Sequence, residues 1–435
     1  MEEIKKVAFI TLGCKVNQYE TNGMAQKLKE SGYEIVDHNE KADIYIINTC
    51  TVTNMSDRKS RQMLRKTKEK NPEAKVIAVG CYAQVAKKEL EKIEEIDLIL
   101  GNEEKKDIVK YCEDLSKKDI ELTDVMHKKE FGEFGDITYT EKTRAVIKVQ
   151  DGCDRFCSYC IIPYARGRVR SRKPEHVISE ITKISKKGIK EVVITGIHIA
   201  SYGKDFKEKY ELIDLLEEIN KIEGIKRIRL GSIEPLLITE EFIERLSKLE
   251  KICDHFHLSL QSGCNETLKR MNRRYSVEQF SKIVKIIRNK YKNANLTTDI
   301  IVGFPEETEE EFKKTFEFLK EINFYKMHIF KYSQRKGTVA AKMKQIDPKI
   351  KEERSKILLE LSDENEDRYN KNHVGKQVEV LWEEEKNGII KGHTKNYILV
   401  EKEIKKEEKN TEKNKENTIE IVTIKEEKEH YVIAK

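Results

Sequence analysis

The stretch Asp151-Gly-Cys-Asp-Arg-Phe-Cys-Ser-Tyr-Cys160 is the most informative part of this 435-residue sequence. Its cysteines, Cys153, Cys157 and Cys160, are separated by three and two residues and follow an apolar run. A turn this tight can bring three thiolates around one centre, which suits an iron–sulfur cube with one iron left open. A closed structural zinc site usually has a fourth protein ligand, and no cysteine or histidine nearby offers one. The pattern therefore favours an iron–sulfur cluster, with a zinc knuckle or core cysteines as alternatives.

The region around this motif alternates short apolar runs with stretches of helical length. Six βα units predict a partial (β/α)6 barrel, in which chemistry gathers at the carboxyl ends of the strands. The expected strands are Ala145–Val149, Glu191–Thr195, Arg227–Leu230, His255–Leu260, Thr297–Val302 and Lys326–Phe330. The expected helices are Glu175–Lys187, Glu211–Ile222, Glu240–Leu249, Val277–Lys290, Glu310–Ile322 and Lys349–Asn370.

The amino-terminal region shows the same alternation. Short apolar runs separated by helices are typical of parallel strands in a doubly wound sheet, so the chain as a whole is predicted to be α/β. The expected strands are Val7–Leu12, Tyr33–Val36, Ile44–Ile47, Val76–Val79 and Asp97–Leu100. The expected helices lie near Gln18–Glu30, Asp57–Lys70 and Gln84–Ile93.

Three further cysteines, Cys14, Cys50 and Cys81, each come just past the end of one of these strands. Parallel strands present their carboxyl ends at one edge of a sheet, so the three side chains can converge there. Gly13 and Gly80 would let the backbone turn tightly beside a bulky inorganic group. A second metal cluster is therefore favoured over ordinary core cysteines.

The carboxyl-terminal tail is predicted to be a small all-β module, because its apolar runs have no helices between them. Glu401–Asn417 interrupts it with six lysines and six glutamates. The predicted strands are Gln377–Trp382, Tyr397–Val400, Thr418–Ile424 and Tyr431–Ile433. The predicted division of the chain is an amino-terminal domain at 1–126, a linker at 127–143, the barrel domain at 144–371 and the β module at 372–435.

Composition excludes several classes of protein. With 37% charged and 38% hydrophobic residues the chain is not disordered as a whole. No apolar run approaches the roughly 18 residues of a membrane span, so no membrane partner is expected. Val7–Thr11 is interpreted as a buried strand rather than a secretion signal. The nine cysteines are then expected to be metal ligands or core residues in the reducing cytoplasm.

Two clusters of basic residues contain no acidic residue. The net charge of +6 is a weak argument for an anionic partner, but these clusters favour a phosphate-rich one over two solvated faces. The first spans Arg58–Lys68 and the second spans Arg166–Lys173. The candidate contacts are Arg58, Arg61, Arg65, Arg166, Arg168, Arg170 and Arg172.

The run Cys153–Cys160 resembles the signature of radical S-adenosylmethionine (SAM) enzymes. The order of two cysteine triplets, barrel and β tail resembles the methylthiotransferases among them, over nearly the whole chain. The resemblance implies two [4Fe–4S] clusters, one on each triplet, and SAM chelated by the open iron of the cluster at Cys153–Cys160. It also implies an enzyme that transfers sulfur-containing groups, a reductant such as flavodoxin or ferredoxin, and no catalytic residue beyond the clusters.

Candidate SAM contacts lie in the cysteine loop and in the loops that follow the barrel strands. Glycine permits close approach, and the polar side chains can pair with ribose hydroxyls and the methionine amine. These candidates are Tyr159, Thr195, Gly196, Ser232, Glu234, Ser259 and Gln261. The run Gly303–Thr308 also resembles a loop of this family.

The segment Leu12–Glu20 resembles the branch that acts on N6-threonylcarbamoyladenosine at tRNA position 37. Lys15-Val16-Asn17 stands where the isopentenyladenosine branch tends to carry Gln-Met-Asn. The tail resembles the RNA-binding TRAM module, and the basic clusters would then contact the anticodon stem-loop. The expected reaction is formation of the 2-methylthio derivative. The alternatives are the same chemistry on isopentenyladenosine tRNA, action on a ribosomal protein, or a non-catalytic zinc- and RNA-binding protein.

Overall fold

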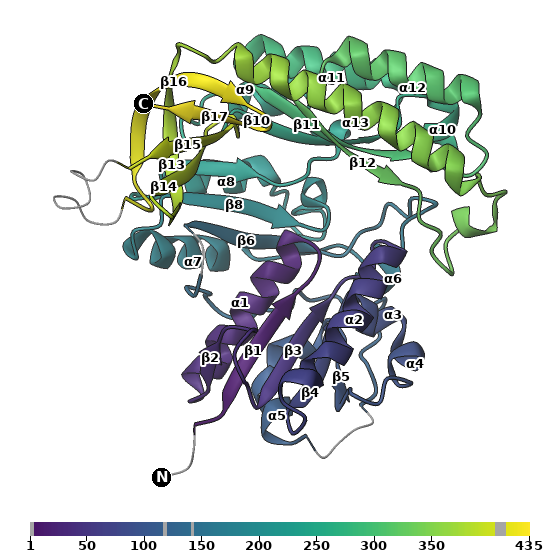
Figure 1. Ribbon diagram of the computed structural model, residues 1–435, viewed down its shortest axis with the longest axis vertical. Coiled ribbons are helices and arrows are strands. Elements are labelled where there is room, and N and C mark those ends of the chain that lie inside the picture. Colours follow the sequence, from purple (N-terminus) through teal and green to yellow (C-terminus); the bar gives the residue numbers. More distant parts are fainter. Residues whose placement is uncertain (1–3, 116–119, 141–142, 405–414) are drawn as a thin grey trace.

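The computed structural model describes residues 4–115, 120–140, 143–404 and 415–435. It has three parts arranged along the chain: an amino-terminal parallel sheet with helices, a central arc of strands and helices, and a small carboxyl-terminal barrel (Figure 1). This confirms the predicted α/β class. Among the described residues, no helix combines the length and the apolar composition needed to cross a bilayer.

The amino-terminal sheet has five parallel strands in the order β2-β1-β3-β4-β5. Helices α1 and α5 pack apolar side chains on one face, and α2, α3 and α4 cover the other. The strands are β1 Lys6–Thr11, β2 Glu34–Val36, β3 Ile44–Thr49, β4 Lys75–Gly80 and β5 Leu98–Ile99. The helices are α1 Lys15–Glu30, α2 Asn54–Lys70, α3 Cys81–Val85, α4 Lys87–Leu90 and α5 Ile108–Glu113.

All three predicted helices of this part differ from their predicted bounds, and α2 begins at Asn54 rather than Asp57. Helix α1 begins at Lys15, three residues before the predicted start, because Cys14 takes the extended conformation of a helix N-cap (φ −98°, ψ 172°). The predicted helix Gln84–Ile93 is wrong. Cys81 opens the short helix α3, and the backbone of Ala86 (φ −132°, ψ 33°) breaks the helical path before α4.

The central part is an arc of six parallel strands around one apolar core, which confirms the predicted partial barrel. Isolated bridges Ile228–Ile252 and Ile233–Leu258 connect its two sheets. The parallel strands are β6 Arg144–Asp151, β8 Glu191–Gly196, β9 Arg227–Leu230, β10 His255–Gln261, β11 Asn295–Val302 and β12 Lys326–Lys331, and a short antiparallel strand, β7 Arg170–Ser171, flanks β6. The helices are α6 Ile162–Arg166, α7 Pro174–Lys186, α8 Leu212–Asn220, α9 Glu240–Leu246, α10 Asn265–Arg270, α11 Val277–Lys290, α12 Glu309–Ile322 and α13 Pro348–Lys371.

The tail forms a closed barrel in the order β13-β14-β15-β17-β16. Strand β14 is missing from the prediction, because Gly392 interrupts its apolar pattern. A glycine is needed there, since a Cβ at this position would lie 2.2 Å from the Leu381 carbonyl oxygen of β13. Residues 405–414 of the predicted interruption lie outside the described residues. The strands are β13 Gln377–Lys386, β14 Ile389–Thr394, β15 Leu399–Glu403, β16 Ile419–Lys428 and β17 Tyr431–Ala434.

The segment 127–140, which makes up most of the predicted linker, forms neither helix nor strand. It lies against helices of two parts of the chain. The Asp136 carbonyl oxygen accepts from Gln26 of α1 at 3.1 Å, and its carboxylate accepts from Ser179 of α7 at 2.8 Å. Residues 141 and 142 are outside the described residues. The segment therefore joins the first sheet to the central arc through its own contacts.

Candidate metal centres

The first cysteine triad lies in the loop between β6 and α6. The Cys153 amide donates to the Gly167 carbonyl oxygen at 3.0 Å, and the Cys160 amide donates to the Cys157 carbonyl oxygen at 2.9 Å. A guanidinium nitrogen of Arg273 lies 3.4 Å from Cys157 Sγ. These contacts fold the loop so that three sulfur atoms from eight residues share one neighbourhood.

The surroundings of Cys153 and Cys160 disfavour the negative forms of these two thiols when no cation is bound. Burial raises the pKa of Cys153 to about 11, and the neighbouring Cys157 thiolate adds to the shift. Burial and Cys157 likewise raise the pKa of Cys160 to about 12. A bound metal would reverse this effect because it binds the thiolate form. Three soft sulfur donors fit an iron–sulfur cube with one open iron better than a four-ligand zinc site.

The second triad gathers at the carboxyl edge of the amino-terminal sheet. Cys14 follows β1 and Cys50 follows β3, while Cys81 begins the helix after β4. Burial raises the pKa of Cys50 to about 11, and the nearby Cys81 and Cys14 thiolates both contribute. Gly13 has φ +95°, and a Cβ on it would lie 2.7 Å from Cys50 Sγ. Glycine is therefore required for the chain to pass this close to the triad, and the three sulfur donors again fit an iron–sulfur cluster.

Charged side chains fill the space between the two triads. Arg166 donates to Glu20 at 2.7 Å, and Lys105 and Lys148 bind the same carboxylate at 2.6 and 2.7 Å. Lys148 also binds Asp151 at 2.6 Å. All five side chains are almost fully buried, and charges in such a place are tolerated because each has an opposite partner. Glu20 and Lys105 come from the amino-terminal part and the others from the central arc, so the network joins the two.

Three of the predicted phosphate contacts are part of this interior. Arg166, Arg170 and Arg172 are at most 1% exposed, so the prediction that they contact RNA is wrong. Arg170 binds Glu103 at 3.2 Å, and Arg172 binds Glu180 at 3.0 Å. Glu103 comes from a distant segment, and Glu180 lies eight residues after Arg172 on α7. The run of basic residues by itself does not show that either arginine meets a buried carboxylate. Of this group Arg168 is exposed, and it lies 3.3 Å from Asp154.

The other basic cluster lies on the surface. Arg58 and Arg65 are exposed on α2, and Arg61 is half-buried, with a nitrogen 2.6 Å from the Tyr82 hydroxyl. Together with Gln62, Lys66 and Glu69 they line a surface hollow of about 560 Å³. Helix α2 begins four residues after Cys50, so this basic face extends away from the second triad.

The predicted SAM contacts lie at the carboxyl ends of β8, β9 and β10, around the first triad. Glu234 is buried and binds Arg155 of the cysteine loop at 3.2 Å. Thr195 is buried, Gly196, Ser259 and Gln261 are half-buried, and Ser232 is exposed. The Ser259 carbonyl oxygen accepts from Arg273 at 3.0 Å, which ties this strand end to the residue that contacts Cys157. Tyr159 packs edge-on against Phe304 at 6.4 Å, in an apolar cluster beside the cysteine loop.

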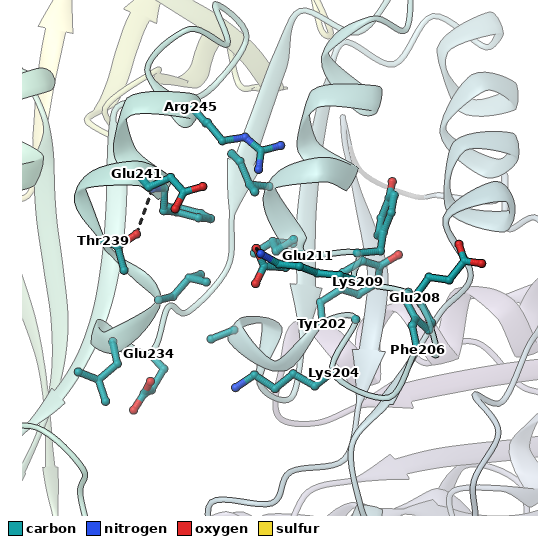
Figure 2. A pocket seen from close by; sticks show the side chains of 18 of the residues that line it. Tyr202, Lys204, Phe206, Glu208, Lys209, Glu211, Glu234, Thr239, Glu241 and Arg245 are labelled. Carbon is teal, nitrogen blue, oxygen red and sulfur yellow. Dashed lines mark hydrogen bonds and ion pairs between the residues drawn. The ribbon is translucent and has the colours of Figure 1, made fainter.

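A cavity of about 620 Å³ opens beside Glu234 and Arg155. The loop that precedes α8 and the segment that leads into α9 form its walls, and Figure 2 shows Glu234 and Lys204 on opposite sides of the open space. Tyr202, Phe206 and Tyr210 pack against one another along one wall, with Tyr202 and Phe206 at 5.6 Å. The cavity is thus continuous with the strand ends where the predicted SAM contacts lie.

Sequence reasoning missed a second connection between the amino-terminal part and the central arc. Arg335, after β12, donates to Thr51 at 2.6 Å and to Asn54 at 2.7 Å, and it binds Asp57 at 2.7 Å. Thr51 directly follows Cys50, so this arginine restrains the segment that leaves the second triad. The partners are about 280 positions apart, which leaves no local pattern from which to predict the contact.

The chain matches two family models, Radical SAM superfamily over residues 147–319 and Uncharacterized protein family UPF0004 over residues 6–101. It is 42% identical over 404 residues to the threonylcarbamoyladenosine tRNA methylthiotransferase MtaB of Bacillus subtilis, covering 91% of this chain and 89% of that protein. The protein of the same name from Aquifex aeolicus is 43% identical over 402 residues, with 92% and 97% covered.

More distant similarities agree with these. A tRNA-2-methylthio-N(6)-dimethylallyladenosine synthase of Clostridium botulinum is 37% identical, with 86% of this chain and 85% of that protein covered. The radical SAM methyltransferase TsrM of Kitasatospora setae matches in fold with a TM-score of 0.58 and 15% identity, over 78% of this chain and 77% of that one. Because the identity is low, this match supports the fold alone. With more than 40% identity to curated relatives over most of both chains, the protein belongs to the methylthiotransferase family of radical SAM enzymes.

Proposed function

We propose that the protein converts N6-threonylcarbamoyladenosine at position 37 of tRNA into its 2-methylthio derivative. The observation that carries this proposal is the pair of cysteine triads, one at the carboxyl edge of each parallel sheet, with residues 166–167 in contact with both. The relatives with 42% and 43% identity bear the name of this activity, whereas the Clostridium botulinum relative named for dimethylallyladenosine has 37%.

The two triads would hold two [4Fe–4S] clusters. Cys153, Cys157 and Cys160 would bind one and leave an iron open for SAM; Cys14, Cys50 and Cys81 would bind the other. When bound, these groups supply a radical that removes hydrogen from carbon 2 of the adenine, the sulfur that replaces it, and a methyl group from SAM. A reductant such as flavodoxin or ferredoxin would provide electrons, and we expect the reaction to take place in the cytoplasm.

The protein's own residues hold these sites in position. Arg273 donates to Cys157 Sγ and to the Ser259 carbonyl oxygen, and so connects the first triad to the end of β10. Arg155 and Glu234 bind each other where the methionine and ribose groups of SAM would be recognised. Arg335 and the buried network around Glu20 fix the second triad against the central arc. Fixed positions matter because both sites must act on one substrate atom.

For the RNA itself we propose the basic face of α2. Arg58, Arg61 and Arg65 lie on one side of this helix and would contact phosphates of the anticodon stem-loop, together with Arg168. The closed barrel of the tail has the architecture expected of an RNA-binding β module, and we propose that it adds a further contact.

The test is the nucleoside profile of tRNA from a strain that lacks the gene, measured by mass spectrometry. We expect 2-methylthio-N6-threonylcarbamoyladenosine to disappear and its unmodified precursor to accumulate. Loss of the isopentenyl product would assign the other tRNA branch, and loss of methylthio groups from a ribosomal protein alone would contradict a tRNA substrate. Purified anaerobically, the protein should contain iron and sulfide; zinc alone would indicate a non-catalytic RNA-binding protein.

A further inference from the structure

Arg166 lies at the boundary between the amino-terminal sheet and the central arc, with its guanidinium completely buried. Its Nε donates to Cys81 Sγ over 3.2 Å. Its two other nitrogens donate to Glu20 at 2.7 Å and to Asn17 at 2.8 Å, both on α1. The hydrogen bonds to Glu20 and Asn17 thus hold the charged Arg166 side chain of the central arc in place. In this position its Nε points at a sulfur of the amino-terminal triad.

The same short segment also touches the other triad. The carbonyl oxygen of Gly167 accepts from the Cys153 amide at 3.0 Å. Gly167 has φ +75°, and a Cβ there would lie 1.9 Å from the Val125 carbonyl oxygen, so the segment takes a path that requires glycine. Arg166 further contacts both carboxylate oxygens of Asp151 at 3.3 Å, two residues before Cys153. Residues 166–167 therefore connect a ligand of one triad to the loop of the other.

The charges near Cys81 do not balance. In the core of the network, four buried cations face three buried anions. The cations are Lys105, Lys148, Arg166 and Arg170, and the anions are Glu20, Asp151 and Glu103. The excess positive charge has the sulfur of Cys81 as its neighbour. A thiolate that binds a cluster, and the negative charge that the cluster gains on reduction, would complete the balance.

Asn102 holds the segment from the amino-terminal side. Its Nδ2 donates to the Ala165 carbonyl oxygen at 2.8 Å and lies 3.8 Å from Cys81 Sγ. The residue before Arg166 is thus bound to the domain that carries the second triad, so the guanidinium has little freedom to turn away from the sulfur.

We propose that Arg166 is a positioning residue that fixes Cys81 and raises the reduction potential of the iron–sulfur cluster on Cys14, Cys50 and Cys81. The inference rests on the proposed function, because it requires a cluster at this triad. An N–H···S hydrogen bond and a nearby positive charge stabilise the reduced, more negative form of a cluster more than its oxidised form. The central arc thereby sets a property of the site carried by the other domain.

The experiment measures the potential of this cluster by itself. In the full chain, Cys153, Cys157 and Cys160 are replaced by alanine, and the remaining cluster is reconstituted anaerobically and titrated with a reductant while its paramagnetic resonance is recorded. Arg166→Lys keeps the positive charge but cannot bond Glu20, Asn17 and Cys81 together. We expect this variant to lower the reduction potential of the cluster by about 59 mV. For a one-electron couple, this shift corresponds to a tenfold change in the equilibrium constant of reduction.

The matched control is Arg170→Lys. Arg170 is equally buried in the same network and binds Glu103 and Asp151. We expect a much smaller shift for this variant. Equal shifts in the two variants, or none for Arg166→Lys, would overturn the inference. If the background protein binds no iron at all, the proposed function fails as well, and this result is distinct from a cluster that forms but does not respond to Arg166.

A second measurement tests the same inference without replacing Arg166, so it does not require that an arginine variant folds. The background protein is labelled with ¹⁵N-arginine, and its reduced cluster is studied by pulsed paramagnetic resonance. A nitrogen 3.2 Å from Cys81 Sγ should produce a resolved ¹⁵N coupling. Absence of that coupling in a protein with an intact cluster would overturn the inference.

Discussion

Tyr397 of the carboxyl-terminal barrel stacks on His255 of β10, with ring centroids 4.7 Å apart and planes inclined by 15°. His393 stacks on Tyr397 at 4.5 Å, and the guanidinium of Arg229 lies 4.7 Å from the centre of the tyrosine ring. His255 is the first residue of its strand, so the barrel is attached at the amino ends of the arc, away from the ends where the cysteine loop begins. These contacts join the described part of the barrel to the central arc.

Tyr397→Ala should therefore loosen the barrel. The ring contacts of an aromatic residue contribute about 1–3 kcal/mol when it is partly buried, and we expect a loss of this size in the free energy of unfolding. Chemical denaturation followed by circular dichroism would measure it. Tyr397→Phe keeps the stacked ring and should stay close to the original stability. If both variants lose the same amount, the stacking is not what holds the barrel.

The two triads should separate in function. Cys157→Ala should abolish SAM cleavage, because it removes a ligand of the cluster at which SAM would bind. Cys50→Ala should leave cleavage near its original rate but stop formation of the methylthio nucleoside, since Cys50 belongs to the other triad. The released 5′-deoxyadenosine and the nucleoside product can be measured in one reaction mixture. Loss of cleavage in a folded Cys50 variant would show that the two sites are not independent.

The basic face of α2 should contribute to tRNA affinity. Arg58→Gln with Arg65→Gln removes two exposed charges, and we expect weaker binding and a salt slope smaller by about one to two counterions. Filter binding at several salt concentrations would measure both. Lys282→Gln with Lys285→Gln removes the same charge from exposed positions on α11, which lies far from α2 (Figure 1). Equal effects of the two pairs would indicate a general charge effect.

His198 should make the stability of the cofactor-free chain depend on pH. Burial, with Arg155 and Arg273 nearby, lowers the pKa of His198 to about 3. Between pH 6.5 and about 3 the unfolded chain binds a proton that the folded chain does not, so stability is lost as the pH falls through this window. His198→Gln should flatten the dependence by up to about 1.4 kcal/mol per pH unit, measured by urea unfolding.

His430 provides the control for that measurement. A hydrogen bond that His430 donates to the Glu366 carboxylate raises the pKa of His430 above its ordinary value, so its contribution to stability is present below pH 6.5 and is lost as the pH rises. His430→Gln should therefore leave the acid-side slope unchanged. An unaltered slope in the His198 variant would mean that this histidine is protonated in the folded chain.

Lys15 should favour a substrate that carries a carboxylate. It follows Cys14 directly and is exposed, and its charge contributes to the lowered pKa of His328 on β12, although burial, His257 and Lys326 have larger effects. The charge of Lys15 therefore acts on the central arc, and we expect it to bind the carboxylate of the threonylcarbamoyl group. Lys15→Gln should raise the KM of a stem-loop bearing that group by about tenfold or more. Lys15→Arg should restore much of the loss, and an unchanged KM in the glutamine variant would contradict this role.

Much of the architecture follows from local patterns in the chain. Each of Cys14, Cys50 and Cys81 comes just after an apolar run, and parallel pairing of such runs places their ends at one edge whatever the details of packing. The first triad is more local still, because its ligands span eight residues. Periodicity and spacing are properties of neighbouring residues, and these features could therefore be predicted.

The fate of the charged residues depended on long-range packing instead. Arg166 and Arg168 are two positions apart and chemically identical, yet one is buried against Glu20 and the other is exposed. A charged side chain can be buried only where other segments of the chain provide partners of opposite charge. The residues next to it in the sequence do not show whether such partners are present. For the same reason, the contact between Arg335 and Asp57 and the stacking of Tyr397 on His255 could not be predicted from the sequence. Both contacts join domains that are far apart in the sequence.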